Sequence, residues 1–351
     1  MRRELIANTN AQPATTIPTF SARPQHADPA TGEVFPIARI DVQGLHVRYD
    51  ELTAVDGLTF SVGAGEIYGL LGRNGAGKTS TISAVAGLLE PWAGECDVLG
   101  RRVVVDSPAL RQALALQPQK ANLFPRLRVR ETLEMWGALY GNPRSVPKLI
   151  DELGLSEKAE TRVAKLSGGQ QQRLLIGTAL VGNTPIVVLD EPTTGLDPHA
   201  RHAVWRIVRD AQAAGTTFLL STHAMDEAEE ICDRLAIMHK GQFVTEGVPA
   251  DLVEKHCPGG VVRVRTKDPT VTAALAELYG EDAVVPSTET GGRDWVQIRV
   301  ANPYTAAERI NDRHGPLDIR PRLSTLEDVF LKMTGTSLSA GDSELPEEAT
   351  V

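Results

Sequence analysis

The chain has 351 residues, a length that suggests two or three compact domains. Its 36 Lys and Arg residues against 45 Asp and Glu residues give a formal net charge of −9, which argues against a bulk nucleic-acid binder. The apolar runs are far shorter than the roughly 20 residues that a membrane-spanning helix needs. The three cysteines are widely spaced and form no CxxC pair. Composition therefore excludes an integral membrane protein and a secreted disulfide scaffold, fits a reducing cytosol, and leaves the activity open.

The two ends of the chain lack the periodicity of helices and strands. Because residues 1–37 are rich in Ala, Thr, Pro and Asn, we expect a disordered N-terminal tail there. The last eleven residues hold four acids and no base, so we expect a disordered acidic tail over 336–351. Between the tails, the sequence predicts a cassette over 38–250 and an accessory α+β domain over 258–335.

Strand and helix patterns alternate along the predicted cassette. Apolar–polar alternation predicts strands at 38–49 and 58–62, and a continuous apolar run predicts a buried strand at 66–71 before a helix at 78–89. Alternating strands and helices favour an α/β fold with a largely parallel sheet. We further expect a mostly helical segment at about 107–180, strands at 185–190, 216–222 and 234–239, and helices at 201–212 and 225–232.

The pattern restarts after the turn residues Cys257-Pro-Gly-Gly260. The expected order is β-α-β-β-α-β, which is the order of the ferredoxin-like motif. The predicted strands are 261–265, 282–285, 295–300 and 317–320, and the predicted helices are 270–279 and 303–314.

The segment Gly72-Arg-Asn-Gly-Ala-Gly-Lys-Thr79 matches the phosphate-loop pattern G-x-x-x-x-G-K-[ST]. Glycines let the backbone N–H groups turn toward phosphate oxygens, and the following helix presents its positive end to the same anion. Lys78 would supply a mobile positive charge to the β- and γ-phosphates, and Thr79 a hydroxyl to Mg²⁺. Because the loop lies between a predicted strand and a predicted helix, we favour a nucleotide site over an ordinary glycine-rich turn. The expected nucleotide-binding residues here are Gly72, Asn74, Gly75, Ala76, Gly77, Lys78, Thr79 and Ser80.

Two acids, Asp190 and Glu191, come at the end of the predicted buried strand Pro185–Asp190. Ligands bind at the carboxyl edge of parallel sheets. We expect Asp190 to hold Mg²⁺ through water, and Glu191 to polarise an attacking water. Taken alone, the two acids could instead cap the next turn; the phosphate loop upstream favours the catalytic interpretation.

A second glycine-rich segment, Leu-Ser-Gly-Gly-Gln, precedes a predicted helix. A serine cap, two glycines and a helix N-terminus together suit an anion. The phosphate loop, this segment, and then Ile-Val-Val-Leu-Asp-Glu-Pro, in that order, resemble the ATP-binding subunits of ABC transporters. The resemblance covers about residues 38–250, and its signature residues are Leu166, Ser167, Gly168, Gly169 and Gln170.

The resemblance implies roles for four further residues. Tyr49 matches the aromatic side chain that stacks on adenine, and Gln119 matches the glutamine that links Mg²⁺ and the site to the membrane partner. Asp197 matches the loop that communicates across a dimer, and His223 matches the switch histidine at the γ-phosphate. The alternatives are an ordinary half-buried strand tyrosine for Tyr49, a surface loop residue for Gln119 and a structural histidine for His223.

The family also implies an architecture, cofactors and partners. The fold would be a P-loop NTPase core with an antiparallel β subdomain and a helical subdomain. Two subunits, expected to be identical, would sandwich two ATP molecules, with Ser167 and Gly169 of one closing on the ATP of the other. The chain would lie in the cytoplasm on the inner face of the plasma membrane, bound to a separate permease that contacts the transported molecule, with no nucleic acid as partner. The implied catalytic residues are Lys78, Glu191 and His223, and the implied Mg²⁺ residues are Thr79, Gln119 and Asp190.

The segment Ser324–Gly335 resembles the ending of subunits from drug-, antibiotic- and lipid-exporting systems of the daunorubicin-resistance type. It also predicts an amphipathic helix, because its apolar residues recur at helical spacing. The expected function is therefore ATP hydrolysis that drives efflux of a drug, antibiotic, lipid or similar amphiphile. An importer ATPase stays open as an alternative because it shares every catalytic motif, and a soluble non-transport ABC ATPase is a weaker one. The predicted apolar face is Leu326, Val329, Phe330 and Met333.

Overall fold

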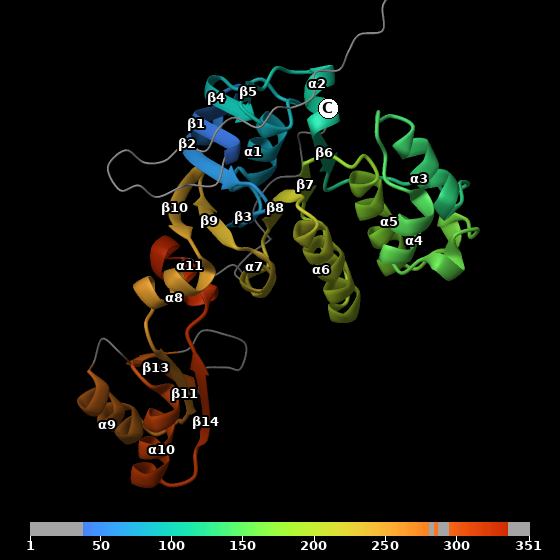
Figure 1. Ribbon diagram of the computed structural model, residues 1–351. Coiled ribbons are helices and arrows are strands. Elements are labelled where there is room, and N and C mark those ends of the chain that lie inside the picture. The colour runs from blue at the N-terminus through green and yellow to red at the C-terminus, as the bar shows by residue number, and fades with distance from the viewer. Residues whose placement is uncertain (1–37, 281–283, 287–294, 336–351) are drawn as a thin grey trace, which may run out of the picture. The chain divides into compact units, whose positions relative to one another are not determined.

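The computed structural model describes residues 38–280, 284–286 and 295–335 (Figure 1). The tails predicted at 1–37 and 336–351 lie outside the described residues. Among the described helices, none combines the length and the hydropathy that a membrane crossing requires.

A six-stranded sheet in the order β10-β9-β3-β8-β7-β6 forms the centre of the cassette. Its neighbouring strands pair in parallel, except β10, which pairs with β9 in antiparallel fashion at one edge. Every residue of β3 and β7 is buried, as their continuous apolar runs predict. The strands are β3 (Ile67–Gly72), β6 (Leu114–Gln117), β7 (Ile186–Asp190), β8 (Thr217–Thr222), β9 (Arg234–His239) and β10 (Gln242–Gly247).

An antiparallel sheet in the order β2-β1-β4-β5 shares an apolar core with α1 and with one face of the central sheet. The alternation of side chains along β3 explains how one strand serves two cores. Tyr68 and Leu70 point into this core, whereas Ile67 and Leu71 belong to the core on the other face. The elements are β1 (Ala38–Tyr49), β2 (Leu52–Gly63), β4 (Ala93–Val98), β5 (Arg101–Arg102) and α1 (Lys78–Val85).

Helices supply most of the core on that other face of the central sheet. Within it, α3 contacts both α4 and α5, and Figure 1 shows these three helices side by side. The α-helices are α2 (Pro108–Ala113), α3 (Val129–Gly137), α4 (Val146–Glu152), α5 (Gly168–Leu180), α6 (Pro198–Ala213), α7 (Met225–Ile231) and α8 (Pro249–His256), and the 3₁₀ turns are η1 (Ser156–Lys158) and η2 (Val163–Lys165).

The segment 107–180 is less helical than its sequence predicts. Leu114–Gln117 forms β6, which pairs with β7; a run of four residues is too short for its period to separate strand from helix. The helix expected at 78–89 ends at Val85, because Gly87 adopts a left-handed φ of +65° just past the helix end. The sequence analysis did not predict four elements that the structure contains, namely β4, β5, β10 and α8.

The accessory segment after α8 runs β-α-β-β-α-β in the described residues. Its antiparallel sheet has the strand order β12-β13-β11-β14, and α9 and α10 pack on one face of it (Figure 1). Val262, Ile298 and Ile310 are fully buried between the sheet and these helices. The elements are β11 (Gly260–Arg265), α9 (Pro269–Tyr279), β12 (Val284–Pro286), β13 (Trp295–Val300), α10 (Pro303–His314) and β14 (Asp318–Leu323).

The last described helix, α11 (Leu326–Thr334), packs against α7 and α8 of the cassette. Leu326, Val329 and Phe330 are fully buried in the same core as the helices of the cassette. Met333 is 37% exposed, so the predicted apolar face is narrower than expected. The Leu326 backbone N–H donates a hydrogen bond to the Glu229 carboxylate on α7.

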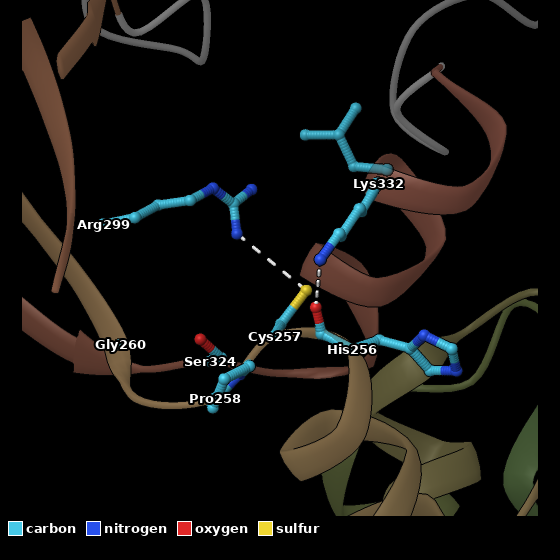
Figure 2. Close-up of a pocket in the computed structure, with 8 residues that line it drawn as sticks. His256, Cys257, Pro258, Gly260, Arg299, Ser324 and Lys332 are labelled. Carbon is cyan, nitrogen blue, oxygen red and sulfur yellow. Dashed lines mark hydrogen bonds between the residues drawn. The ribbon is translucent and has the colours of Figure 1, made fainter. Parts of the chain in front are cut away.

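Both connections between the cassette and the accessory sheet meet at one junction (Figure 2). The Ser324 N–H donates to the Gly259 carbonyl at 3.1 Å. Lys332 Nζ on α11 donates to the His256 carbonyl at 2.6 Å, and Arg299 on β13 donates to Cys257 Sγ at 3.9 Å. Residues of this junction, among them Cys257, Arg299 and Ser324, line the pocket drawn in Figure 2.

We expect Phe330→Ala to lower the free energy of unfolding by about 3–5 kcal/mol, because it leaves a cavity in the core between α11 and the cassette. Met333→Ala, on the exposed side of the same helix, should cost less than about 0.5 kcal/mol. Urea unfolding of both variants measures this difference, and equal midpoints would show that α11 does not contribute to the core.

Candidate functional site

The predicted phosphate loop connects β3 to α1 with the expected backbone geometry. Gly75 and Gly77 adopt left-handed φ angles of +79° and +102°, and a Cβ on Gly77 would lie 2.4 Å from the Ala54 carbonyl oxygen. Only glycine fits there without strain. Gly77 is the N-cap of α1, so the positive end of that helix opens onto the loop. The loop therefore has the form of a phosphate cradle.

Lys78, the first residue of α1, is almost fully buried beneath the loop. Its Nζ donates to the carbonyls of Gly72 at 2.8 Å and Arg73 at 3.1 Å, and it lies 3.2 Å from Glu191 Oε1. Burial lowers the pKa of Lys78, and the Glu191 carboxylate opposes that shift. The lysine is thus held at the loop by two carbonyls and one carboxylate.

Glu191 directly follows β7, and its carboxylate contacts side chains from several segments of the chain. Gln119 Nε2 donates to its Oε2 at 3.2 Å, Thr194 Oγ1 donates to the same oxygen at 3.1 Å, and His223 Nδ1 lies 3.1 Å from it. Together with the Lys78 contact, these bonds bring four predicted site residues into one cluster. We refer to Lys78, Gln119, Glu191 and His223 as the Glu191 cluster.

The electrostatics of the cluster keep Glu191 ionised at neutral pH. Its hydrogen bond with His223 lowers the pKa of Glu191 to about 2 against the opposing effect of burial, and the charge of Lys78 contributes in the same direction. The same hydrogen bond raises the pKa of His223, again against the effect of burial. The histidine and the carboxylate therefore stabilise each other's charged forms.

The backbone of Glu191 has a left-handed φ of +48°, which is uncommon for a residue other than glycine. Ser221 on β8 helps to hold it, since the Glu191 N–H donates to Ser221 Oγ at 3.0 Å and the Ser221 hydroxyl donates to Asp190 Oδ1. One hydroxyl thus ties the two acids at the end of β7 to the neighbouring strand.

Tyr49 lies beside the phosphate loop at the end of β1. Its hydroxyl donates to Ser80 Oγ at 3.4 Å, and the residue is 47% exposed. Its ring is therefore accessible next to α1, and its stacking on a base stays a prediction.

The predicted signature segment lies at the start of α5. Ser167 accepts from the Gln170 N–H at 3.4 Å, and the Gln170 side chain accepts from the Ser167 N–H at 3.0 Å, which is a capping box. In the described part of the chain, no hydrogen bond or ion pair joins residues 166–170 to the Glu191 cluster. Asp197, expected in a dimer-communication loop, caps α6 by accepting from the Ala200 N–H at 2.9 Å.

The sequence analysis did not predict Ser221, which bonds both acids, or Thr194, which bonds Glu191. Each lies close to a predicted site residue, Ser221 two positions before His223 and Thr194 three after Glu191. Both are hydroxyl residues close in sequence to a predicted site residue, and this proximity is the sequence feature that could have suggested them.

The described residues include oxygen donors that could hold Mg²⁺ together with a nucleotide. No group of three His, Cys, Asp or Glu side chains in the described ranges could hold a metal ion. Mg²⁺ in nucleotide sites takes only one or two carboxylates from the protein, and phosphates and waters supply the rest. Asp190, Thr79 and Gln119 offer the oxygen donors that this arrangement needs.

Comparison with known proteins identifies the family. A family profile described as "ABC transporter" matches residues 55–194. The Nod factor export ATP-binding protein I of Burkholderia lata is 39% identical over 309 residues, covering 86% of this chain and 99% of that protein. The protein of the same name from Rhizobium sp. (strain N33) is 37% identical over 304 residues, covering 85% of this chain and 98% of that protein. The matched length exceeds the cassette, so it includes part of the accessory segment.

Solved ATP-binding cassettes match a large part of this chain. An ATP-binding subunit of an ABC transporter is 32% identical with a TM-score of 0.56, covering 62% of this chain and 92% of the other. The ADP conformation of MJ1267, an ATP-binding cassette of an ABC transporter, is 25% identical with a TM-score of 0.58, covering 63% of this chain and 94% of the other. The predicted family and cassette fold are thereby confirmed. The chain belongs to the ATP-binding proteins of ABC transporters, in the group of export ATP-binding proteins, and is an ATPase.

Proposed function

We propose that this ATPase powers the efflux of an amphiphilic small molecule, of the drug, antibiotic or lipid type, through a separate membrane permease. The observation that carries the enzymatic part is the convergence of Lys78, Gln119 and His223 on Glu191 beside the phosphate loop. The relatives named as export proteins favour efflux over import. In this proposal the permease selects the transported molecule.

The phosphate loop, Lys78 and the N-terminus of α1 bind the phosphates of ATP, and the exposed ring of Tyr49 stacks on its base. Thr79 and Gln119 would supply oxygen ligands to Mg²⁺ and Asp190 would hold it through water, and the ion would neutralise phosphate charge. The left-handed backbone of Gly77 supports the assignment of this loop to phosphate binding. The other loop residues, from Gly72 to Ser80, approach the phosphates mainly through their backbone.

Glu191 orients and polarises the attacking water, and its low pKa keeps it in the carboxylate form that can accept a hydrogen bond from water. His223 holds that carboxylate in place, and its protonated form, which the pairing with Glu191 favours, adds positive charge beside the γ-phosphate. Gln119 contacts the same carboxylate, so a movement of its loop changes the surroundings of the water.

The signature segment acts on the ATP of a second, facing subunit. The capped N-terminus of α5 at Ser167 suits an anion and has no bond to this chain's own Glu191 cluster in the described residues. Two identical chains would then complete two ATP sites, with Asp197 near the contact between them. ATP would hold the pair closed, and hydrolysis would release it. Such a pair would work on the inner face of the plasma membrane, bound to its permease.

We expect Glu191→Gln to retain ATP binding and to lower the hydrolysis rate by about 100-fold or more, because the amide cannot polarise water as the carboxylate does. The variant should also accumulate as an ATP-bound dimer. Steady-state phosphate release and size-exclusion chromatography with ATP measure the two effects. Glu230→Gln, an exposed acid on α7, is the matched control, and a wild-type rate in Glu191→Gln would show that Glu191 is not the base.

We expect the ring of His223 to titrate above its ordinary pKa of 6.5, and to return toward that value in Glu191→Gln. A histidine whose pKa is raised by folding adds stability that is complete below pH 6.5 and is lost as the pH rises through the folded-state value. NMR titration of the imidazole protons in the nucleotide-free chain measures both values. An unchanged His223 titration in the variant would contradict the pairing.

A tagged full-length chain, extracted from its native membrane in mild detergent, should copurify with a polytopic membrane protein. The recovered pair, placed in vesicles, should then export its substrate only with ATP, and Glu191→Gln should abolish that export. Consistent recovery of ribosomes or nucleic acid in place of a membrane protein would contradict the transport role. ATP-dependent uptake by the pair would identify an importer.

A further inference from the structure

Glu227 on α7 is a buried carboxylate with no role in the mechanism proposed above. The residue is 3% exposed, and burial raises the pKa of its carboxyl. One oxygen accepts a hydrogen bond from the Thr193 hydroxyl, and the other lies 2.9 Å from Arg201 Nε. A carboxylate buried this deeply is destabilising unless its partners hold it in a defined geometry. Its contacts therefore fix the relative positions of the segments that make them.

Two of those segments carry residues of the ATP site. Thr193 lies two positions after Glu191, and its neighbour Thr194 donates a hydrogen bond to Glu191 Oε2 at 3.1 Å. Glu227 lies four positions after His223, near the start of α7. The Thr193–Glu227 bond thus joins the loop of the catalytic carboxylate to the segment of the histidine.

Arg201 brings in the third segment, because it lies on α6 one turn after Asp197. Its guanidinium also contacts Asp226 Oδ2 at 3.1 Å, but the Asp226 side chain is 76% exposed. Solvent screens that second pair, whereas the Glu227 carboxylate that faces the same arginine is buried. The β7–α6 loop, α6 and α7 meet at this one carboxylate.

The loop that Glu227 holds includes the unusual backbone conformation of Glu191, with its φ of +48°. Such conformations persist only where the surrounding contacts over-determine them. Ser221 accepts a hydrogen bond from this backbone, and Thr194, the residue next to Thr193, donates one to the Glu191 side chain. Loss of the hydrogen bond between Thr193 and Glu227 would let the position of Glu191 relative to His223 vary more.

We propose, on the basis of the function proposed above, that Glu227 is a positioning residue that sets the geometry between Glu191 and His223 through Thr193. Its effect is on the hydrolysis step rather than on nucleotide binding. In the described residues, no hydrogen bond or ion pair joins Glu227 to the phosphate loop, which carries the binding contacts.

The test is steady-state ATP hydrolysis by variants of the full-length chain. Glu227→Gln should lower kcat by about tenfold or more, because small misplacements of reacting groups have effects of that size, with KM for ATP changed less than about twofold. Thr193→Val, which removes the hydroxyl but keeps the shape, should lower kcat similarly. Thr193→Ser, which keeps the hydroxyl, should restore kcat to near the wild-type value.

Asp226→Asn is the matched control, since it removes the exposed contact with the same arginine and should leave kcat unchanged. Wild-type kcat in Glu227→Gln and Thr193→Val would overturn the proposal, as would equal loss in Thr193→Val and Thr193→Ser. If Glu227→Gln does not fold, the two Thr193 variants decide the question. Glu191→Gln, assayed in parallel, separates the two hypotheses, because its full activity would contradict the catalytic role of Glu191 itself.

Discussion

The buried contact between Lys78 and Glu191 is the constraint on which the site depends. Their side chains are 4% and 6% exposed, and the charged atoms are 3.2 Å apart. Buried charges are tolerated only when each is also satisfied by hydrogen bonds. Two loop carbonyls satisfy Lys78, and Gln119, Thr194 and His223 satisfy Glu191. In the proposed mechanism Lys78 also binds the phosphates of ATP, so nucleotide binding changes the balance of charge around the carboxylate.

The topology of the central sheet explains why these groups can meet. The segments that carry them follow β3, β6, β7 and β8, which are neighbours in the order β3-β8-β7-β6 and run in parallel. Their carboxyl ends therefore lie at one edge, where ligands bind in open parallel sheets. The phosphate loop, the glutamine, the acids and the histidine come from distant parts of the sequence, and the sheet brings them to one edge.

The contiguous parts of the site could be predicted from the sequence because each is a local pattern. The phosphate loop, the two acids and the buried strands needed only a few neighbouring residues. The bond between Thr193 and Glu227 joins positions 34 residues apart, and neither position has a local feature that points to the other. The strand β6 was missed for a related reason, since its four residues form a strand only through pairing with β7. Long-range contacts of this kind are decided by tertiary structure.

The junction of Gly259 and Ser324 makes the accessory segment an insertion rather than an extension. The chain leaves the cassette after α8 and returns to it in α11, and the entering and leaving strands are paired neighbours, with Gly260 opposite Leu323. The two crossing points are therefore about one strand spacing apart, roughly 5 Å. A linker of two or three residues could bridge them, so evolution or design can exchange everything between β11 and β14 while α8 and α11 keep their places in the core of the ATPase.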